Sequence, residues 1–208
     1  MVDTQDDAGT FFYVLQDALR ILYVDDDPIL REFAQVHLTT DTASVATAED
    51  GLVALAMLEE VKPDLILLDL EMPRLDGFEV LRHLRAEAAY SRMPVIVATG
   101  REDVNAVDRA FREGATSFVV KPINWRLLSY QIRYVHRAHQ AELSLLEARR
   151  RARTEVNEAN DTLTRLCSLG ARFVADALRI DPSLKAPAAG YLQALENASA
   201  TARRSAEG

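Results

Sequence analysis

The stretch ILYVDDDPIL, residues Ile21 to Leu30, sets four apolar residues directly before three aspartates. Its apolar half, Ile21–Val24, is typical of a buried β-strand. Three adjacent negative charges repel one another, and burying any of them is costly unless a partner offsets the charge. The stretch therefore predicts a strand that ends at a charged site, and a cation is the natural partner for its aspartates.

The chain up to residue 138 continues to alternate between short apolar runs and amphipathic stretches. We expect β-strands at residues 20–24, 44–47, 65–69, 94–98 and 117–120. We expect helices at residues 28–38, 49–61, 76–89 and 104–113, and a fifth that begins near Asn124. Continuous strands rich in Leu, Ile and Val are typical of a parallel sheet buried on both faces. The pattern therefore predicts an α/β fold with a doubly wound, five-stranded parallel sheet.

Polar residues stand at the carboxyl ends of four of these strands. Asp25 and Asp26 follow the first strand, and Asp69 ends the third. Thr99 follows the fourth strand, and Lys121 follows the fifth. Because the carboxyl ends of parallel strands meet at one edge of a sheet, where ligands gather, we expect these side chains to face a shared pocket.

The residue types in this expected pocket point to phosphoryl chemistry with a metal ion. Three carboxylates form an oxygen-rich site for a hard divalent cation, so Mg²⁺ is the expected cofactor. An aspartate beside such an ion can attack phosphorus and form an aspartyl phosphate. Lys121 would neutralise charge on the incoming phosphoryl group, and Thr99 would donate a hydrogen bond to it.

Four motifs carry a resemblance to a known family: YVDDDP, DLILLDLEMPRLDGFEVLR, PVIVATG and GATSFVVKPI, in this order. Together they make residues 19–137 similar to the receiver domain of bacterial two-component response regulators. The resemblance implies a flavodoxin-like sheet of order 2-1-3-4-5. It also implies a phosphoacceptor, Asp69, that takes its phosphoryl group from a histidine kinase or a phosphotransfer protein. Asp26 would bind Mg²⁺ directly, Asp25 would act largely through water, and Asp27 would start the first helix as its N-cap.

The resemblance gives roles to further residues. The backbone carbonyl of Glu71 would complete the metal site, and Thr99 and Phe118 would form a switch pair. Lys121 would contact the phosphoryl group, and the bond from Lys121 to Pro122 would be cis, which proline makes tolerable. From its residue type alone, Phe118 could equally belong to the core.

Glu71 and Arg101 lie two residues beyond the expected phosphoacceptor and two beyond the switch threonine. In receivers these positions border the route of the attacking water. Both side chains are long enough to meet across the mouth of the pocket, so we expect an ion pair that lengthens the lifetime of the phosphoryl group. The alternative is that both side chains point to solvent.

Two other classes of protein share parts of this pattern. A haloacid-dehalogenase-type phosphatase also joins a nucleophilic aspartate, a threonine and a lysine, but its nucleophile lies on the first strand in an Asp-x-Asp motif. Here the candidate lies on the third strand and the residue two later is Glu71 instead of aspartate, so we expect no enzyme activity beyond the protein's own phosphoryl transfer and dephosphorylation. A scaffold or sequestration module without its own output is the second alternative.

Charge and composition change near residue 139. Residues 1–138 hold 14 Lys/Arg and 23 Asp/Glu, a balance of −9, whereas residues 139–208 hold 10 and 9, a balance of +1. We therefore expect an N-terminal extension (1–18), a receiver domain (19–138) and a helical coiled-coil tail (139–208).

The tail carries a heptad pattern that is apolar at both ends and polar at Glu142 and Arg149. Its a positions fall at residues 128, 135, 142, 149, 156, 163, 170 and 177, and its d positions at 131, 138, 145, 152, 159, 166, 173 and 180. It predicts a modest coiled coil and a homodimer through the C-terminal helix, which phosphorylation would switch. A break near Gly170 with a hairpin return is the alternative. The segment 123–146 resembles the linker that follows receivers attached to cyclic-di-GMP enzymes.

The overall composition indicates the cellular compartment and the classes of partner to expect. One cysteine, Cys167, rules out a disulfide framework and fits the reducing cytoplasm, where we expect the protein. No run approaches the ~18 consecutive apolar residues of a membrane span, so we expect no membrane contact. The net charge of −8 argues against direct nucleic-acid binding. We expect solvated helix faces around the four histidines, His37, His83, His136 and His139.

Overall fold

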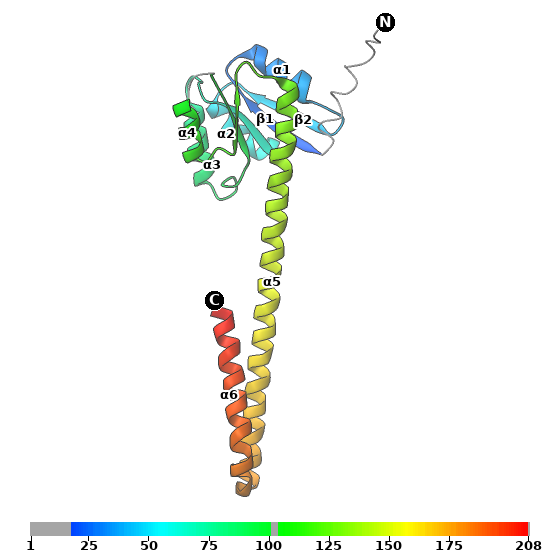
Figure 1. Ribbon diagram of the computed structural model, residues 1–208, viewed down its shortest axis with the longest axis vertical. Helices are drawn as coiled ribbons and strands as arrows, with labels where there is room; N and C mark the ends of the chain where they lie inside the picture. The colour runs from blue at the N-terminus through cyan, green and yellow to red at the C-terminus, as the bar shows by residue number, and fades with distance from the viewer. Residues whose placement is uncertain (1–17, 101–103, 208) are drawn as a thin grey trace. The chain divides into compact units, whose positions relative to one another are not determined.

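The structure, a computed structural model, describes residues 18–100 and 104–207 (Figure 1). Five strands form one parallel sheet in the order β2-β1-β3-β4-β5, which confirms the predicted doubly wound, flavodoxin-like arrangement. The strands are β1 (Leu19–Val24), β2 (Ala43–Ala48), β3 (Leu65–Asp69), β4 (Val95–Thr99) and β5 (Ser117–Val120). Of the expected N-terminal extension, residues 1–17 lie outside the described residues.

Helices cover both faces of the sheet because successive residues of a strand point to opposite sides. Ile21 and Tyr23 of β1 pack with helix α1 and the first turns of α5. Leu22 and Val24 of the same strand pack on the opposite face, with α2, α3 and α4. The helices are α1 (Pro28–Leu38), α2 (Gly51–Val61), α3 (Gly77–Ala86), α4 (Val104–Arg112) and α5 (Trp125–Ile180).

Most predicted boundaries lie within two residues of the observed ones, and the exceptions have local causes. Strand β4 begins at Val95 rather than Pro94, because a proline has no N–H to donate to the sheet. Helix α3, predicted to reach residue 89, ends at Ala86. The chain then turns, with the N–H of Tyr90 donating to the carbonyl of Glu87 at 3.0 Å, and this turn buries the Tyr90 ring.

Aspartates start three helices and fix the loops around the carboxyl edge of the sheet. Asp27 accepts a hydrogen bond from the N–H of Ile29 at 2.8 Å, which confirms its predicted role as the N-cap of α1. Asp50 caps α2, and Asp76 caps α3 in a capping box with Glu79. These caps satisfy N–H groups that a helix leaves without internal partners.

The start of α3 lies directly against the end of β3. A Cβ atom on Gly77 would lie 2.3 Å from the carbonyl oxygen of Asp69, so only glycine fits at this position. The N–H of Gly77 also donates to the carbonyl of Leu70 at 3.1 Å. The close approach holds the loop that follows β3 against the sheet.

The described residues divide into two compact units, with the division between Ala141 and Glu142. Helix α5 continues without interruption through Gly170, so the break expected near that residue as the alternative is wrong, whereas the hairpin return of that alternative is present. The chain turns back further along, at a short 3-10 helix (Pro182–Leu184), and continues as α6 (Lys185–Glu207), drawn in red in Figure 1.

The second unit is a helical hairpin in which α6 packs on one face of α5. A Cβ atom on Gly170 would lie 3.2 Å from Leu195 of α6, and Cys167 is buried at the same contact. Leu166 and Phe173, on a neighbouring face of α5, remain exposed. The hairpin therefore covers only part of the apolar surface of α5.

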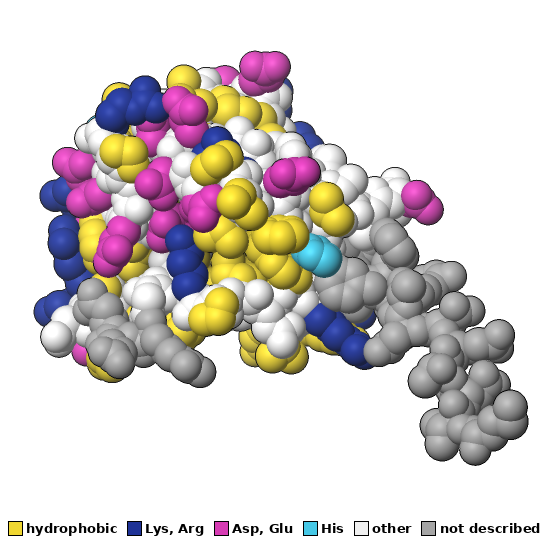
Figure 2. Space-filling view, turned by 90° about the horizontal axis from the view of Figure 1, so that it is seen from above, with side chains coloured by type: hydrophobic (Ala, Val, Ile, Leu, Met, Phe, Trp, Pro, Cys, Tyr) yellow, Lys and Arg dark blue, Asp and Glu magenta, His cyan; other side chains and the backbone are white. Residues whose placement is uncertain are grey.

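Acidic side chains are spread widely over the face of the first unit in Figure 2, around a patch of hydrophobic ones. The exposed apolar residues of this unit include Ile29, Phe33 and Val36, which recur at helical spacing along α1. Within residues 18–100 and 104–207, no helix combines the length and the apolar character that crossing a membrane requires.

Candidate functional site

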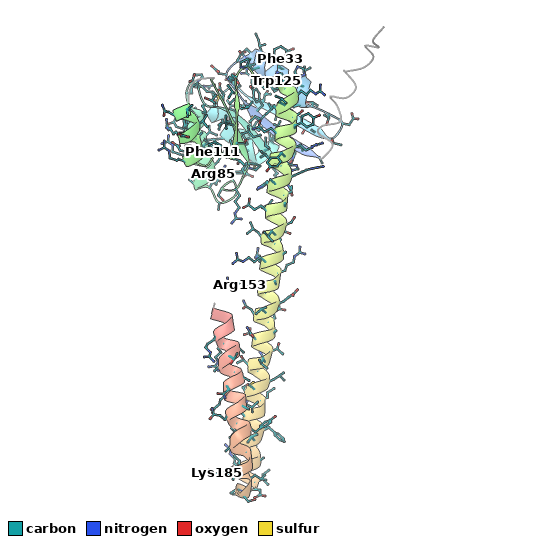
Figure 3. The ribbon with its side chains drawn as sticks, viewed as in Figure 1. Phe33, Arg85, Phe111, Trp125, Arg153 and Lys185 are labelled. Atoms are coloured by element: carbon teal, nitrogen blue, oxygen red, sulfur yellow. The ribbon has the colours of Figure 1, made fainter. Side chains whose placement is uncertain are left out.

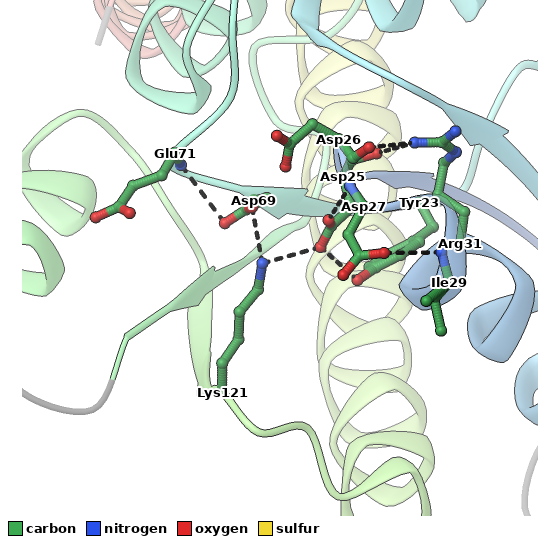
Figure 4. Close-up of polar contacts among 9 residues, drawn as sticks. All are labelled: Tyr23, Asp25, Asp26, Asp27, Ile29, Arg31, Asp69, Glu71 and Lys121. Atoms are coloured by element: carbon green, nitrogen blue, oxygen red, sulfur yellow. Dashed lines mark hydrogen bonds and ion pairs between the residues drawn. The ribbon is translucent and has the colours of Figure 1, made fainter.

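Three carboxylates meet at the carboxyl edge of the sheet (Figure 4). Asp25 and Asp26 follow β1, Asp69 ends β3, and each offers an oxygen atom within 4.8 Å of the other two. Asp25 and Asp69 are buried, whereas Asp26 is exposed. Adjacent parallel strands end here side by side, which is why residues 44 positions apart share one site.

Lys121 bridges two of these carboxylates. Its Nζ donates to Oδ2 of Asp69 at 2.7 Å and to Oδ2 of Asp25 at 3.0 Å. Burial alone would lower the pKa of the Lys121 ammonium, but its hydrogen bonds to the two carboxylates and their charges outweigh burial and raise it. Burial raises the pKa of Asp69 above its usual range, although Lys121 opposes this rise. The pair therefore places a protonated amine beside a desolvated carboxyl group.

Two residues that the sequence did not point to also hold the first carboxylate in place. Tyr23 donates its hydroxyl hydrogen to Oδ2 of Asp25 at 2.7 Å, and Arg31 donates to the backbone carbonyls of Asp25 and Asp26 at 2.7 and 2.9 Å. The N–H of Asp27 donates to Oδ1 of Asp25 at 3.0 Å. Burial, together with the charge of Asp25, raises the pKa of the Tyr23 phenol, so it remains a donor.

The remaining predicted residues divide into those near the three carboxylates and those elsewhere. Thr99 ends β4, beside β3, and is buried. The N–H of Lys121 donates to the carbonyl of Thr99 at 2.8 Å, and the bond from Lys121 to Pro122 is cis. The N–H of Glu71 points to Oδ1 of Asp69 at 3.5 Å, while its side chain is exposed.

Phe118 lies on the edge strand β5 and is 39 % exposed, so it is not the core residue that was the alternative. Its ring meets that of Phe111 edge-on, with centroids 6.1 Å apart. Arg101 lies outside the described residues, so the ion pair between Glu71 and Arg101 stays a prediction.

The donor set of the three carboxylates suits a hard divalent cation. All of the candidate ligand atoms are oxygens, and in the described part of the chain no histidine or cysteine joins them. Oxygen ligands with carboxylate charge are what Mg²⁺ and similar ions prefer, whereas zinc selects nitrogen and sulfur. The residues present therefore fit a magnesium ion.

The family model of the response regulator receiver domain matches residues 21–133, which hold the whole sheet apart from the start of β1. The chain belongs to this family. The three aspartates Asp25, Asp26 and Asp69 and the lysine Lys121 all lie within the residues that the receiver model covers.

Curated relatives of this receiver include a transcriptional regulatory protein and a DNA-binding response regulator. The transcriptional regulatory protein AfsQ1 of Streptomyces coelicolor is 38 % identical over 122 residues, covering 59 % of this chain and 53 % of the relative. The DNA-binding response regulator MtrA of Mycolicibacterium smegmatis is 37 % identical over 123 residues, with the same two shares. The chain spans about half the length of these relatives, so the DNA binding named there is a property of those proteins.

Solved structures show the same receiver fold. The chemotaxis protein CheY4 of Vibrio cholerae matches with a TM-score of 0.53 and 30 % identity, over 56 % of this chain and 98 % of that one. NtrX of Brucella abortus, solved in complex with ATP, matches with a TM-score of 0.59 and 26 % identity, over 63 % of this chain and 30 % of that one.

Proposed function

We propose that this response regulator is a phosphoacceptor whose Asp69 takes a phosphoryl group from a histidine kinase or phosphotransfer protein in a Mg²⁺-dependent reaction. The observation that carries the proposal is the bridge that Lys121 makes between Asp69 and Asp25, with the carboxylate of Asp26 beside it. An ammonium group held between two carboxylates is positioned to stabilise the negative charge that a phosphoryl group brings.

The transfer would take place at one oxygen of Asp69. This oxygen attacks the phosphorus of a phosphohistidine, the new P–O bond forms as the P–N bond breaks, and the electron pair of the broken bond stays on the imidazole nitrogen. Lys121 then moves its contact from the carboxylate to the phosphoryl oxygens. The hydroxyl of Thr99 donates a hydrogen bond to one of these oxygens, and Phe118 responds as its switch partner.

Asp26 and Asp25 would hold Mg²⁺ in different ways, beside Asp69. Asp26 is exposed and free to bind the ion directly, and the backbone carbonyl of Glu71 would be a further ligand. Oδ2 of Asp25 already accepts hydrogen bonds from Tyr23 and Lys121, which favours contact through a water molecule. When bound, the ion supplies positive charge to the phosphoryl oxygens.

The first prediction tests the phosphoacceptor. Incubation with acetyl phosphate and Mg²⁺ should add one phosphoryl group to the wild type, as read by intact mass. Asp69→Asn should abolish the addition because the amide lacks the nucleophilic oxygen, and EDTA should block it in the wild type. Asp41→Asn, an exposed loop aspartate, is the matched control and should be labelled normally. Full labelling of Asp69→Asn would overturn the assignment.

The output would pass through the C-terminal helix. We propose a receiver over residues 19–138 and a tail over 139–208 that joins two copies of the chain, with phosphorylation switching the association. The exposed residues Leu166 and Phe173 support this proposal, because they occupy d positions of the heptad repeat and α6, which packs at Gly170 and Cys167, leaves them uncovered.

A further inference from the structure

Tyr23 joins the acidic site to the hydrophobic core. Its ring is 1 % exposed and packs between the sheet and helices α1 and α5. Tyr23 and Asp25 point to the same side of the chain because they are two residues apart in an extended segment. The hydroxyl therefore reaches the carboxylate of Asp25. A phenylalanine would fill the same apolar space, so packing alone does not account for the hydroxyl.

The carboxylate that Tyr23 contacts is held at both oxygens. Tyr23 and Lys121 donate to Oδ2 at 2.7 and 3.0 Å, and the N–H of Asp27 donates to Oδ1 at 3.0 Å. A hydrogen bond to a charged group is stronger than one between neutral groups, and it costs more to lose when the acceptor is buried. The Tyr23 hydroxyl and the Asp25 carboxylate are thus joined by a short, buried hydrogen bond.

The other end of Tyr23 contacts the first residue of α5. Its ring meets Trp125 edge-on, with centroids 6.1 Å apart and an interplanar angle of 73°. Trp125 stacks on His37 at 5.8 Å, and His37 stacks on Phe33 at 6.0 Å. Figure 3 shows Phe33 and Trp125 at the same end of the first unit. Aromatic rings therefore run in contact from Asp25 to the start of α5 and on to α1.

We propose that Tyr23 is a positioning residue for Asp25 and that its ring passes changes at this carboxylate to Trp125. The inference rests on the proposed function, since the change is the arrival of Mg²⁺ or a phosphoryl group. When a cation draws Asp25 toward the pocket, the hydroxyl must follow or lose its hydrogen bond, and the ring then shifts against Trp125. This route leaves from β1 and is distinct from the switch pair on β4 and β5.

Trp125 is the single tryptophan of the chain, so its fluorescence reports this contact in the full-length protein. Titration of the wild type with Mg²⁺, and then with beryllofluoride as a phosphoryl mimic, should change the emission in a saturable way. The midpoint should match the Kd for Mg²⁺ measured by calorimetry. In Tyr23→Phe the emission change should be lost, while Mg²⁺ still binds, weakened by roughly tenfold, the effect of one hydrogen bond.

Tyr90→Phe is the matched control. It removes another hydrogen bond from a tyrosine to a carboxylate, from the Tyr90 hydroxyl to the exposed Glu59 at 2.7 Å. The Tyr90 ring lies in the core on the opposite face of the sheet, so this variant should respond like the wild type. If Mg²⁺ binds to the wild type but its emission does not change, this inference is overturned while the proposed function stands. This test needs only the wild type, so it applies even if Tyr23→Phe fails to fold. A full emission change in Tyr23→Phe, or its equal loss in Tyr90→Phe, would also overturn it. No Mg²⁺ binding to the wild type would overturn the proposed function as well.

Discussion

Arg20 and Asp64 form an ion pair that ties the start of β1 to the residue before β3. The guanidinium donates to both carboxylate oxygens, at 3.0 and 3.1 Å, and the N–H of Arg20 donates to the same carboxylate at 2.9 Å. Burial alone would raise the pKa of Asp64, but these hydrogen bonds and the charge of Arg20 lower it below its usual range. A carboxyl group of this kind stabilises the fold above its unfolded pKa, and the stabilisation is lost as the pH falls through the folded value.

The pair predicts a pH-dependent effect of Arg20→Gln. At pH 7 the variant should lose up to about 1 kcal/mol of unfolding free energy, because the pair is partly exposed to solvent. Below about pH 4, where the carboxyl group of the unfolded chain is protonated, the loss should shrink. Urea unfolding of wild type and variant at the two pH values measures the difference, with the exposed Arg92→Gln as control. A loss that stays the same at both pH values would contradict the prediction.

The residues that the sequence predicted and those that it missed differ in how they reach the site. Asp25, Asp69 and Lys121 could be predicted because strand ends fix their positions. Tyr23 and Arg31 could not, because the reach of a phenol or a guanidinium depends on how the helices pack. The spacing of Tyr23, two residues before Asp25, was the available signal.

The histidines show the same limit. The expectation that all four are solvated is wrong for His136, which is only 8 % exposed. It lies on the face of α5 that also carries the buried residues Ile132 and Val135. His37 is also in contact with its neighbours, because it stacks on Trp125. Residue type alone leaves a histidine intermediate between core and solvent, so the helix face on which it lies decides its burial.

Gly77 sets the distance between α3 and β3, and its substitution tests this contact. In Gly77→Ala the new Cβ would meet the backbone carbonyl of Asp69, and neither backbone can move without disturbing the sheet. We expect a loss of about 1–3 kcal/mol in unfolding free energy, together with slower labelling by acetyl phosphate, because Asp69 is displaced.

Gly100→Ala is the control for stability, since a Cβ at Gly100 meets no atom within 4 Å. Thermal unfolding and the initial rate of labelling measure the two effects. Equal stability of the two variants would show that the contact at Gly77 is not tight.

The position of the turn between α5 and α6 shows which of two helix-breaking residues, Gly170 or Pro182, ends helix α5. Glycine in a helix costs about 1 kcal/mol relative to alanine, which contact with α6 at Gly170 can offset. A proline costs about three times as much inside a helix, and α5 ends two residues before Pro182. The sequence shows both residues, but only the packing of α6 decides that Gly170 stays helical.

The whole chain should be a dimer through the face of α5 that carries the exposed residues Leu166 and Phe173. Phe173, which is 76 % exposed, occupies a d position there, and Phe173→Glu would place a charge in an apolar interface at a cost of several kcal/mol. We expect this variant to be a monomer by light scattering. Ala175→Glu, exposed at an f position of the same helix, should remain a dimer. A monomeric wild type with and without phosphoryl group would contradict the proposal.

The parallel order of the sheet has a consequence for how the chain folds. Ile21 pairs with Val45 on one side and with Leu65 on the other, so every strand pair of the first unit must close a long loop before it gains contacts. The helices of the second unit form from neighbouring residues and need no such closure. We therefore expect the first unit, which leaves the ribosome before the second, to reach its native state after it.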